Sequence, residues 1–271
     1  MKHFKLMMLG LALSAGFTTQ MQAQEAQSFV HQQSNTEDYV WPTDPQVLTK
    51  LKHWQDQKFG VLMHWGLYSV PGIVESWSIC SEDWIVRERK PTYEEDKAWY
   101  WSQKDSLNPV NFDPSKWADV MKKAGMKYMI FTTKHHDGFC MFDTKYTDFS
   151  IAHGPFGKDP RHNIAKEVFN AYRNKGFMIG CYFSKPDWHS KWFWNPYYAT
   201  PNRRINYKKK QHPDWWQNYR KFTQNQLNEL TTDYGNIDIL WLDGGWITGD
   251  EIGLDTILVD ARNPHLTCGA S

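Results

Sequence analysis

The sequence lacks the features of several common classes of protein. Its four cysteines, Cys80, Cys140, Cys181 and Cys268, are far apart, so neither a zinc ribbon nor a redox pair is indicated. The formal charge is only +1, and no basic stripe stands out beyond residues 208–210, which argues against a nucleic-acid ligand. No glycine-rich phosphate loop follows the first predicted strand, so a nucleotide site is not supported.

The N-terminal apolar run, Leu6–Phe17, is too short to span a membrane. It follows two lysines, and Ala23 is a suitable cleavage point. These features predict a cleaved secretory signal peptide over residues 1–23 and a periplasmic or secreted mature protein. Residues 24–44 are polar and rich in glutamine, and we expect a flexible leader there.

Aromatic residues are abundant. The chain has 15 Trp, 13 Tyr and 15 Phe among its 271 residues, and many lie in predicted loops. Exposed aromatic rings suit flat, partly apolar ligands such as sugars, although long loops also use such residues to build small cores of their own.

Predicted strands and helices alternate along the chain, which indicates an α/β fold with a parallel sheet. The strands are expected at 58–66, 128–133, 178–184 and 237–242, and the helices at 45–57, 113–124, 163–175, 213–234 and 254–262. A (β/α)8 (TIM) barrel needs eight such units. Residues 45–271 would then hold about the first four, with a fifth strand beginning near residue 265. An open doubly wound sheet would also fit this pattern.

Polar side chains lie at the ends of the predicted strands. His64 ends the first strand, His135 and His136 follow the second, and Asp243 ends the fourth. Barrel enzymes place their chemistry at the C-terminal ends of strands. Each residue alone also has a structural interpretation, because Asp before Gly often starts a turn and a single His is often only hydrogen-bonded structure.

Several motifs together resemble glycoside hydrolase family 29, the α-L-fucosidases. They are the runs 58–66 (KFGVLMHWG), 112–125 (FDPSKWADVMKKAG), 128–139 (YMIFTTKHHDGF), 182–184 (YFS) and 241–243 (WLD). The resemblance covers roughly residues 45–262. It implies a (β/α)8-like barrel that removes terminal L-fucose from glycans with retention of configuration.

The resemblance also implies roles for individual residues. Asp243 matches the nucleophile, and Glu75 and Trp77 match an acidic-aromatic pair, here separated by Ser76. The positions that match fucose-contacting residues are His64, His135, His136, Tyr182 and Trp241. Retaining glycosidases need two carboxyl groups about 5 Å apart, and they need no metal or other cofactor, so none is expected.

The family's acid/base glutamate commonly comes from a later strand or loop, and a β-sandwich domain usually follows the barrel. We therefore expect this chain to be truncated before both. Glu75 is the best internal acid/base candidate, and Asp250 and Glu251 are weaker ones. An incomplete sheet would leave edges and apolar surface exposed, which predicts self-association.

Two alternatives stay open. The first is a fucose-binding fragment without an acid/base residue. The second is a metal-dependent hydrolase that uses strand-end ligands from His64, His135, His136, Asp187, His189 and Asp243. No His-x-His pair supports the second alternative.

Overall fold

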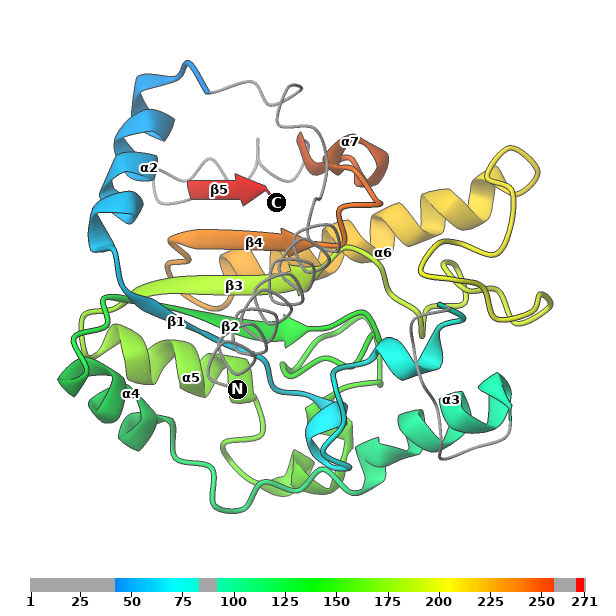
Figure 1. Ribbon diagram of the computed structural model, residues 1–271, viewed down its shortest axis with the longest axis horizontal. Coiled ribbons are helices and arrows are strands. Elements are labelled where there is room, and N and C mark those ends of the chain that lie inside the picture. Colours follow the sequence, from blue (N-terminus) through cyan, green and yellow to red (C-terminus); the bar gives the residue numbers. More distant parts are fainter. Residues whose placement is uncertain (1–41, 83–91, 256–266, 271) are drawn as a thin grey trace, which may run out of the picture. The chain divides into compact units, whose positions relative to one another are not determined.

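The computed structural model describes residues 42–82, 92–255 and 267–270 (Figure 1). The chain divides into two compact units, Met1–Leu48 and Thr49–Ser271. Residues 42–48 are the described part of the first unit. There Asp44 Oδ1 accepts a hydrogen bond from the Gln46 N–H at 2.7 Å, which satisfies a free amide at the start of a helix.

The second unit is built on one parallel sheet with its strands in chain order, β1-β2-β3-β4-β5 (Figure 1). The strands are β1 (Gly60–Met63), β2 (Tyr128–Lys134), β3 (Met178–Ser184), β4 (Ile239–Asp243) and β5 (Thr267–Ala270). Because all the strands run parallel, their C-terminal ends lie at one edge of the sheet. Polar groups that follow different strands can therefore meet there.

Helices connect the strands. They are α2 (Pro45–Gln57), α3 (Tyr93–Ser102), α4 (Pro114–Lys123), α5 (Ile164–Arg173), α6 (Pro213–Thr232) and α7 (Gly249–Ile252). Short 3-10 turns lie at Leu67–Ser69, Trp77–Ile79, Gln103–Asp105, Ile151–His153 and Pro155–Lys158. No helix in the described ranges is long and apolar enough to cross a membrane.

The boundaries of α4 show how the sequence starts and stops a helix. Asp113 caps it by accepting from the Lys116 N–H at 3.1 Å, and Pro114 occupies the first turn, where its missing N–H costs nothing. Gly125 follows the last turn at φ 86°, a left-handed conformation that residues with a Cβ rarely adopt.

The two faces of the sheet differ. Alternate strand residues such as Phe131, Cys181 and Leu240 pack with α5 and α6 in the main apolar core. Burying each large side chain there stabilises the fold by about 1.5–3 kcal/mol. The opposite face, which we call the inner face, carries a smaller cluster of Ile130, Tyr182 and Ile239.

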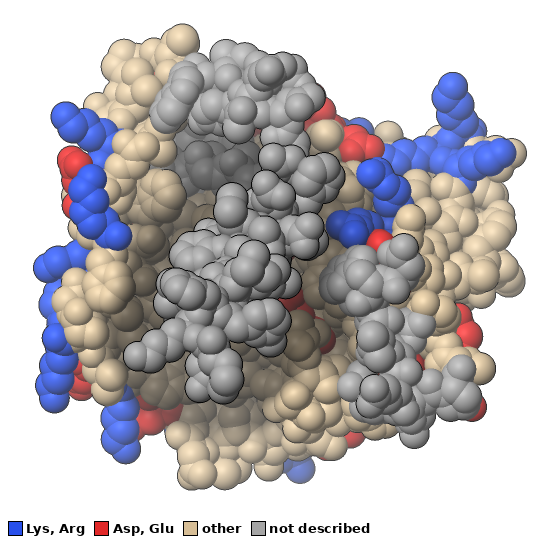
Figure 2. Space-filling model, viewed as in Figure 1, with Lys and Arg blue, Asp and Glu red and all other residues tan. Residues whose placement is uncertain are grey.

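Charged side chains lie mostly towards the margins of the face drawn in Figure 2. Lys and Arg form groups near its edges.

Most predicted elements are confirmed, with small shifts at their ends. The predicted strand 178–184 matches β3, and the helix 45–57 matches α2. β1 ends at Met63, so His64 lies one residue beyond it. The helix expected at 254–262 falls largely outside the described residues, as do the signal peptide and most of the leader.

A fifth strand follows the four that the sequence predicted in full. β5 pairs in parallel with β4, with Thr267 opposite Ile239 and Ala270 opposite Leu242. This agrees with the expected start of a fifth strand near residue 265. Main-chain hydrogen bonding to a neighbouring strand depends little on side-chain apolarity, so a short polar segment can still pair.

Candidate active site

Polar side chains from four strands converge at one edge of the sheet. His64 follows β1, His135 and His136 follow β2, and Asp243 ends β4. The ring of Tyr182, from β3, lies edge-on to His64 with 4.8 Å between ring centroids. The sheet brings together the residues that the sequence predicted at strand ends.

The two adjacent histidines both turn towards this group. The register between β2 and β3 shifts at Thr132–Lys134, just before them. His135 and His136 are 3% and 1% exposed, and their ring centroids lie 4.4 Å apart. His135 faces Glu75 and His136 faces Asp243, so the pair links the two carboxylates.

Two hydrogen-bond donors hold Asp243, and His136 lies beside it. The Tyr182 hydroxyl donates to its Oδ2, and the Gly244 N–H donates to its Oδ1 at 2.6 Å. His136 Nε2 lies 3.6 Å from Oδ2, and the Asp243 side chain is 35% exposed. Burial and the nearby Asp243 raise the pKa of Tyr182 well above its usual value, so this phenol stays protonated and donates. The carboxylate is fixed in place yet reachable from solvent.

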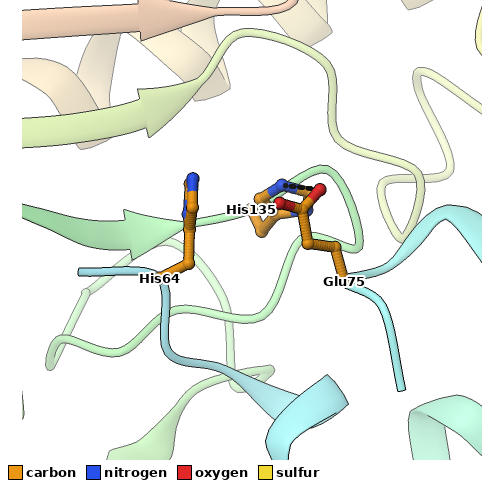
Figure 3. Close-up of side chains that lie close together, drawn as sticks. All are labelled: His64, Glu75 and His135. Atoms are coloured by element: carbon orange, nitrogen blue, oxygen red, sulfur yellow. Dashed lines mark ion pairs between the residues drawn. The ribbon is translucent and has the colours of Figure 1, made fainter. Parts of the chain in front are cut away.

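Glu75 adopts a backbone conformation that is uncommon outside glycine, with φ 44°. Its Oε2 accepts from the Trp77 indole N–H at 3.1 Å and lies 3.4 Å from His135 Nε2. Figure 3 shows Glu75 and His135 directed towards one another, with His64 beside them. Such backbone strain is typical of functional sites.

The hydrogen bond from His135 lowers the pKa of Glu75, against the opposing effect of burial. A general acid requires the opposite shift, because it must hold its proton near neutral pH. In the ligand-free site Glu75 is therefore set up as an ionised acceptor.

The surroundings of His64 and His136 disfavour their charged forms. Burial lowers the pKa of His136 well below its usual value, and the neighbouring His135 and His64 add to the effect. Partial burial and the nearby His135 likewise lower the pKa of His64, although the carboxylates of Glu75 and Asp243 act to raise it. Neutral rings can either donate to or accept from hydroxyl groups.

Aromatic rings form one wall around His136. The Trp77 and Trp246 rings lie 5.1 and 5.0 Å from it, and the buried Trp188 lies at 5.1 Å. Arg203 stacks over Trp77 at 5.2 Å and over Trp246 at 5.3 Å. Sequence reasoning predicted Trp77 but did not assign a site role to Trp188, Trp246 or Arg203. The Asp187-Trp188 pair directly after β3 could have drawn attention to Trp188, but nothing local pointed to Arg203.

Trp241 lies two residues before Asp243 on the same inner face of β4. It pairs in register with Tyr182 and packs against the inner-face cluster. The structure thus places this predicted sugar-contacting residue beside the group, next to Tyr182.

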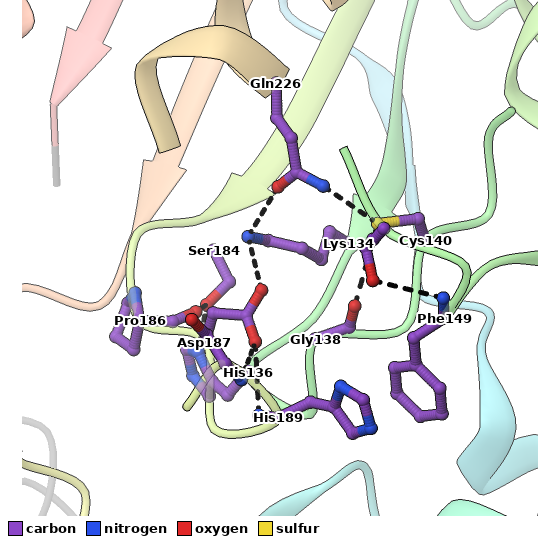
Figure 4. Close-up of polar contacts among 12 residues, drawn as sticks. Lys134, His136, Gly138, Cys140, Phe149, Ser184, Pro186, Asp187, His189 and Gln226 are labelled. Carbon is purple, nitrogen blue, oxygen red and sulfur yellow. Dashed lines mark hydrogen bonds and ion pairs between the residues drawn. The ribbon is translucent and has the colours of Figure 1, made fainter. Parts of the chain in front are cut away.

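Behind the site lies a buried ion pair (Figure 4). Lys134 Nζ lies 3.0 Å from Asp187 Oδ2, with the side chains 0% and 3% exposed. Gln226 Oε1 accepts from the same ammonium at 3.1 Å. The other oxygen of Asp187 accepts from the N–H groups of His189 and Ser190, which fixes the loop that follows β3.

Two groups among the described residues have ligand atoms within 4.8 Å of one another and could hold a metal ion: His64, Glu75 and His135, and His135, His136 and Asp243. Both adjacent histidines belong to the second group. Asp187 and His189, which the metal hypothesis also included, belong to neither group. Asp187 pairs with Lys134, and the His189 ring stacks on Phe149 at 3.8 Å.

The weaker acid/base candidates lie in α7. Thr248 and Glu251 form a capping box at its start, and Glu251 also pairs with Lys209. These contacts give Glu251 a structural role at the start of α7.

Comparison with known proteins gives a consistent result. Residues 26–265 match the family described as Alpha-L-fucosidase. Human plasma alpha-L-fucosidase is 29% identical over 211 residues, which cover 72% of this chain and 40% of that protein. The chain therefore spans well under half the length of this curated relative.

Solved structures agree. Alpha-L-fucosidase isoenzyme 1 from Paenibacillus thiaminolyticus has a TM-score of 0.64 and 32% identity, covering 82% of this chain and 50% of that one. A Bacteroides thetaiotaomicron GH29 alpha-L-fucosidase, solved as a trapped covalent intermediate with 2-fluoro-fucosyl fluoride, has a TM-score of 0.62 and 30% identity. The matched region covers 85% of this chain and 49% of the Bacteroides thetaiotaomicron chain.

Proposed function

Because the chain belongs to the alpha-L-fucosidase family of glycoside hydrolases, we propose that it acts on terminal α-L-fucosyl linkages of glycans and retains the anomeric configuration. The observation that carries this proposal is the position of Asp243. A partly exposed carboxylate is fixed by Tyr182 and Gly244 at the end of β4, among neutral histidines.

In this proposal Asp243 attacks the anomeric carbon while the bond from that carbon to the glycosidic oxygen breaks and the aglycone leaves. Water then hydrolyses the resulting covalent fucosyl-enzyme and releases fucose and the free carboxylate. The Tyr182 hydroxyl and the Gly244 N–H hold the two carboxylate oxygens so that attack needs little reorganisation. The trapped intermediate of the Bacteroides thetaiotaomicron relative supports this route.

The sugar would lie among His64, His135 and His136, with Tyr182 and Trp241 on the β3–β4 side and Trp77 on the loop side. Neutral imidazoles can bond its hydroxyls, and indole faces can cover its apolar side. We further propose that the five-stranded sheet is part of a (β/α)8-like barrel, supported by its parallel order and strand-end site.

Glu75 has two candidate roles, acid/base and sugar-binding carboxylate. Because its pKa is lowered, we propose that it binds the sugar in its ionised form. Glu75→Gln should then raise the KM for aryl α-L-fucosides roughly 10-fold or more, because a charge-assisted hydrogen bond is worth about 1.5–3 kcal/mol. The effect should be similar for good and poor leaving groups.

The measurement is kcat and KM across a series of aryl fucosides. A loss of about 10²–10⁴-fold confined to substrates with poor leaving groups would instead make Glu75 the acid/base residue. Fucose binding without turnover of any fucoside would favour the second candidate function, a fucose-binding protein that lacks its acid/base group.

The metal-dependent hydrolase remains a candidate because two ligand groups exist in the described structure. The glycosidase proposal predicts that dialysis against a strong chelator leaves fucoside hydrolysis within about twofold of its starting rate, since protonation and not a Lewis acid assists departure. Loss of activity on chelation, restored by added Zn²⁺, would support the metal alternative.

We also propose that the protein is exported to the periplasm or secreted. This rests on the sequence of residues 1–23 alone, and these residues lie outside the described structure.

A further inference from the structure

The Nδ1 atom of each histidine in the site lies within hydrogen-bond distance of a hydroxyl oxygen. His64 Nδ1 lies 2.6 Å from Thr132 Oγ1, and His136 Nδ1 lies 2.5 Å from Ser184 Oγ. His135 Nδ1 lies 2.6 Å from Ser76 Oγ. The hydroxyls come from β2, β3 and the loop after β1, so the arrangement is built from separate parts of the fold.

Two of these hydroxyls have a second partner that fixes the position of their proton. Thr132 Oγ1 donates to the Met63 carbonyl at 3.0 Å, and Ser184 Oγ donates to the Pro186 carbonyl at 2.7 Å. A hydroxyl has one proton, and a carbonyl oxygen can only accept. Each oxygen must therefore accept from its histidine, so the Nδ1 atoms of His64 and His136 carry hydrogen.

We propose that Thr132 and Ser184 are positioning residues that hold His64 and His136 as Nδ1–H tautomers, with the lone pair on each Nε2 free to accept from a ligand hydroxyl. This assignment adds detail to the proposed function. It rests on the proposed function only for the identity of the ligand, a sugar.

His135 has the opposite polarity. Its Nε2 lies 3.4 Å from the Glu75 carboxylate, which accepts and cannot donate when ionised. The proton of a neutral His135 therefore lies on Nε2, and its Nδ1 accepts from the Ser76 hydroxyl. In the ligand-free site His135 therefore donates to Glu75, whereas His64 and His136 each present an Nε2 lone pair that can accept from a ligand.

The assignment has a consequence at Asp243. His136 Nε2 and Asp243 Oδ2 lie 3.6 Å apart, and both are acceptors if Nδ1 carries the proton. These two acceptor atoms can both be hydrogen-bonded by a donor group that lies between them. A hydroxyl group of a bound sugar supplies such a donor, whereas a deoxy or O-methyl group at the same position cannot.

The tautomers can be read directly by NMR on the full-length, ligand-free protein labelled with ¹⁵N at histidine. Long-range ¹H–¹⁵N correlations distinguish Nδ1–H from Nε2–H rings, and single His→Gln variants assign the signals. We expect Nδ1–H patterns for His64 and His136 and an Nε2–H pattern for His135. Nε2–H patterns for His64 and His136 would overturn the proposal. Because no ligand is needed, this result is independent of whether the protein binds fucose.

The functional test compares two adjacent threonines of β2. Thr132 and Thr133 are 1% and 0% exposed, and each donates to a backbone carbonyl, but only Thr132 contacts a histidine. Thr132→Val should weaken L-fucose binding and raise the KM of a fucoside roughly three- to tenfold, the effect of one neutral hydrogen bond.

Thr132→Ser should restore both values, and Thr133→Val should leave them unchanged. In the NMR spectrum Thr132→Val should also release His64 from its single tautomer. Equal effects of Thr132→Val and Thr133→Val on KM would indicate a merely structural role and would contradict the proposal.

Discussion

Asp243→Ala is expected to abolish fucoside hydrolysis, lowering kcat by about 10⁴-fold or more, the order of loss seen when a nucleophile is removed. Without the carboxylate no covalent intermediate can form, and its loss leaves the Tyr182 hydroxyl and the Gly244 N–H without their acceptor. Asp243→Asn, which keeps the shape and one acceptor oxygen, should be equally inactive yet retain L-fucose binding. The measurement is single-turnover hydrolysis of an aryl α-L-fucoside beside calorimetric binding.

The control is Asp119→Asn. Asp119 forms an exposed pair with Lys175 on the helical side of the fold, and such pairs contribute little. This variant should match the parent in both assays. Near-parental turnover by Asp243→Ala would show that another group is the nucleophile.

The second large effect concerns stability. Asp187→Asn removes the charge that faces Lys134 while keeping an oxygen for the N–H groups of His189 and Ser190. The buried ammonium then retains Gln226 but loses its counter-charge. Breaking a buried pair in this way costs about 3–5 kcal/mol, which for a chain of this size corresponds to a Tm decrease of about 6–20 °C.

Adding Lys134→Met should recover part of the loss, because it removes the unpaired charge and places an apolar chain beside Phe183 and Phe222. Asp233→Asn is the matched control, since Lys145 and Asp233 form a similar pair at 3.4 Å with both side chains largely exposed. It should cost at most about 1 kcal/mol. Thermal unfolding of the parent, Asp187→Asn, the double variant and Asp233→Asn gives the comparison, and a double variant no more stable than Asp187→Asn would contradict this account.

Much of the architecture was predictable because many helices and strands are specified by signals in their own sequence. β3 is an almost uninterrupted apolar run, and α4 carries both its cap and its stop in its own sequence. The placement of His135 and His136 was also predictable in outline, because a parallel sheet brings the ends of its strands to a single edge.

Other features depend on partners distant in sequence. Lys134 reads locally as a surface lysine, but Asp187 and Gln226, 53 and 92 residues away, allow it to be buried. Arg203 joins the aromatic wall through Trp77 and Trp246, which come from separate loops. The backbone strain at Glu75 has no sequence signal, since a glutamate gives no preference for positive φ.

The order of the strands also governs when the site can form. Each strand pairs with the strand that precedes it in the chain, so the sheet can extend in the direction of synthesis. His64, His135 and His136 follow the first two strands, whereas Asp243 arrives only with β4. During biosynthesis the three histidines would thus be made before the proposed nucleophile, which arrives on β4 together with Trp241. In the proposed function, hydrolytic competence would therefore be a late event in folding.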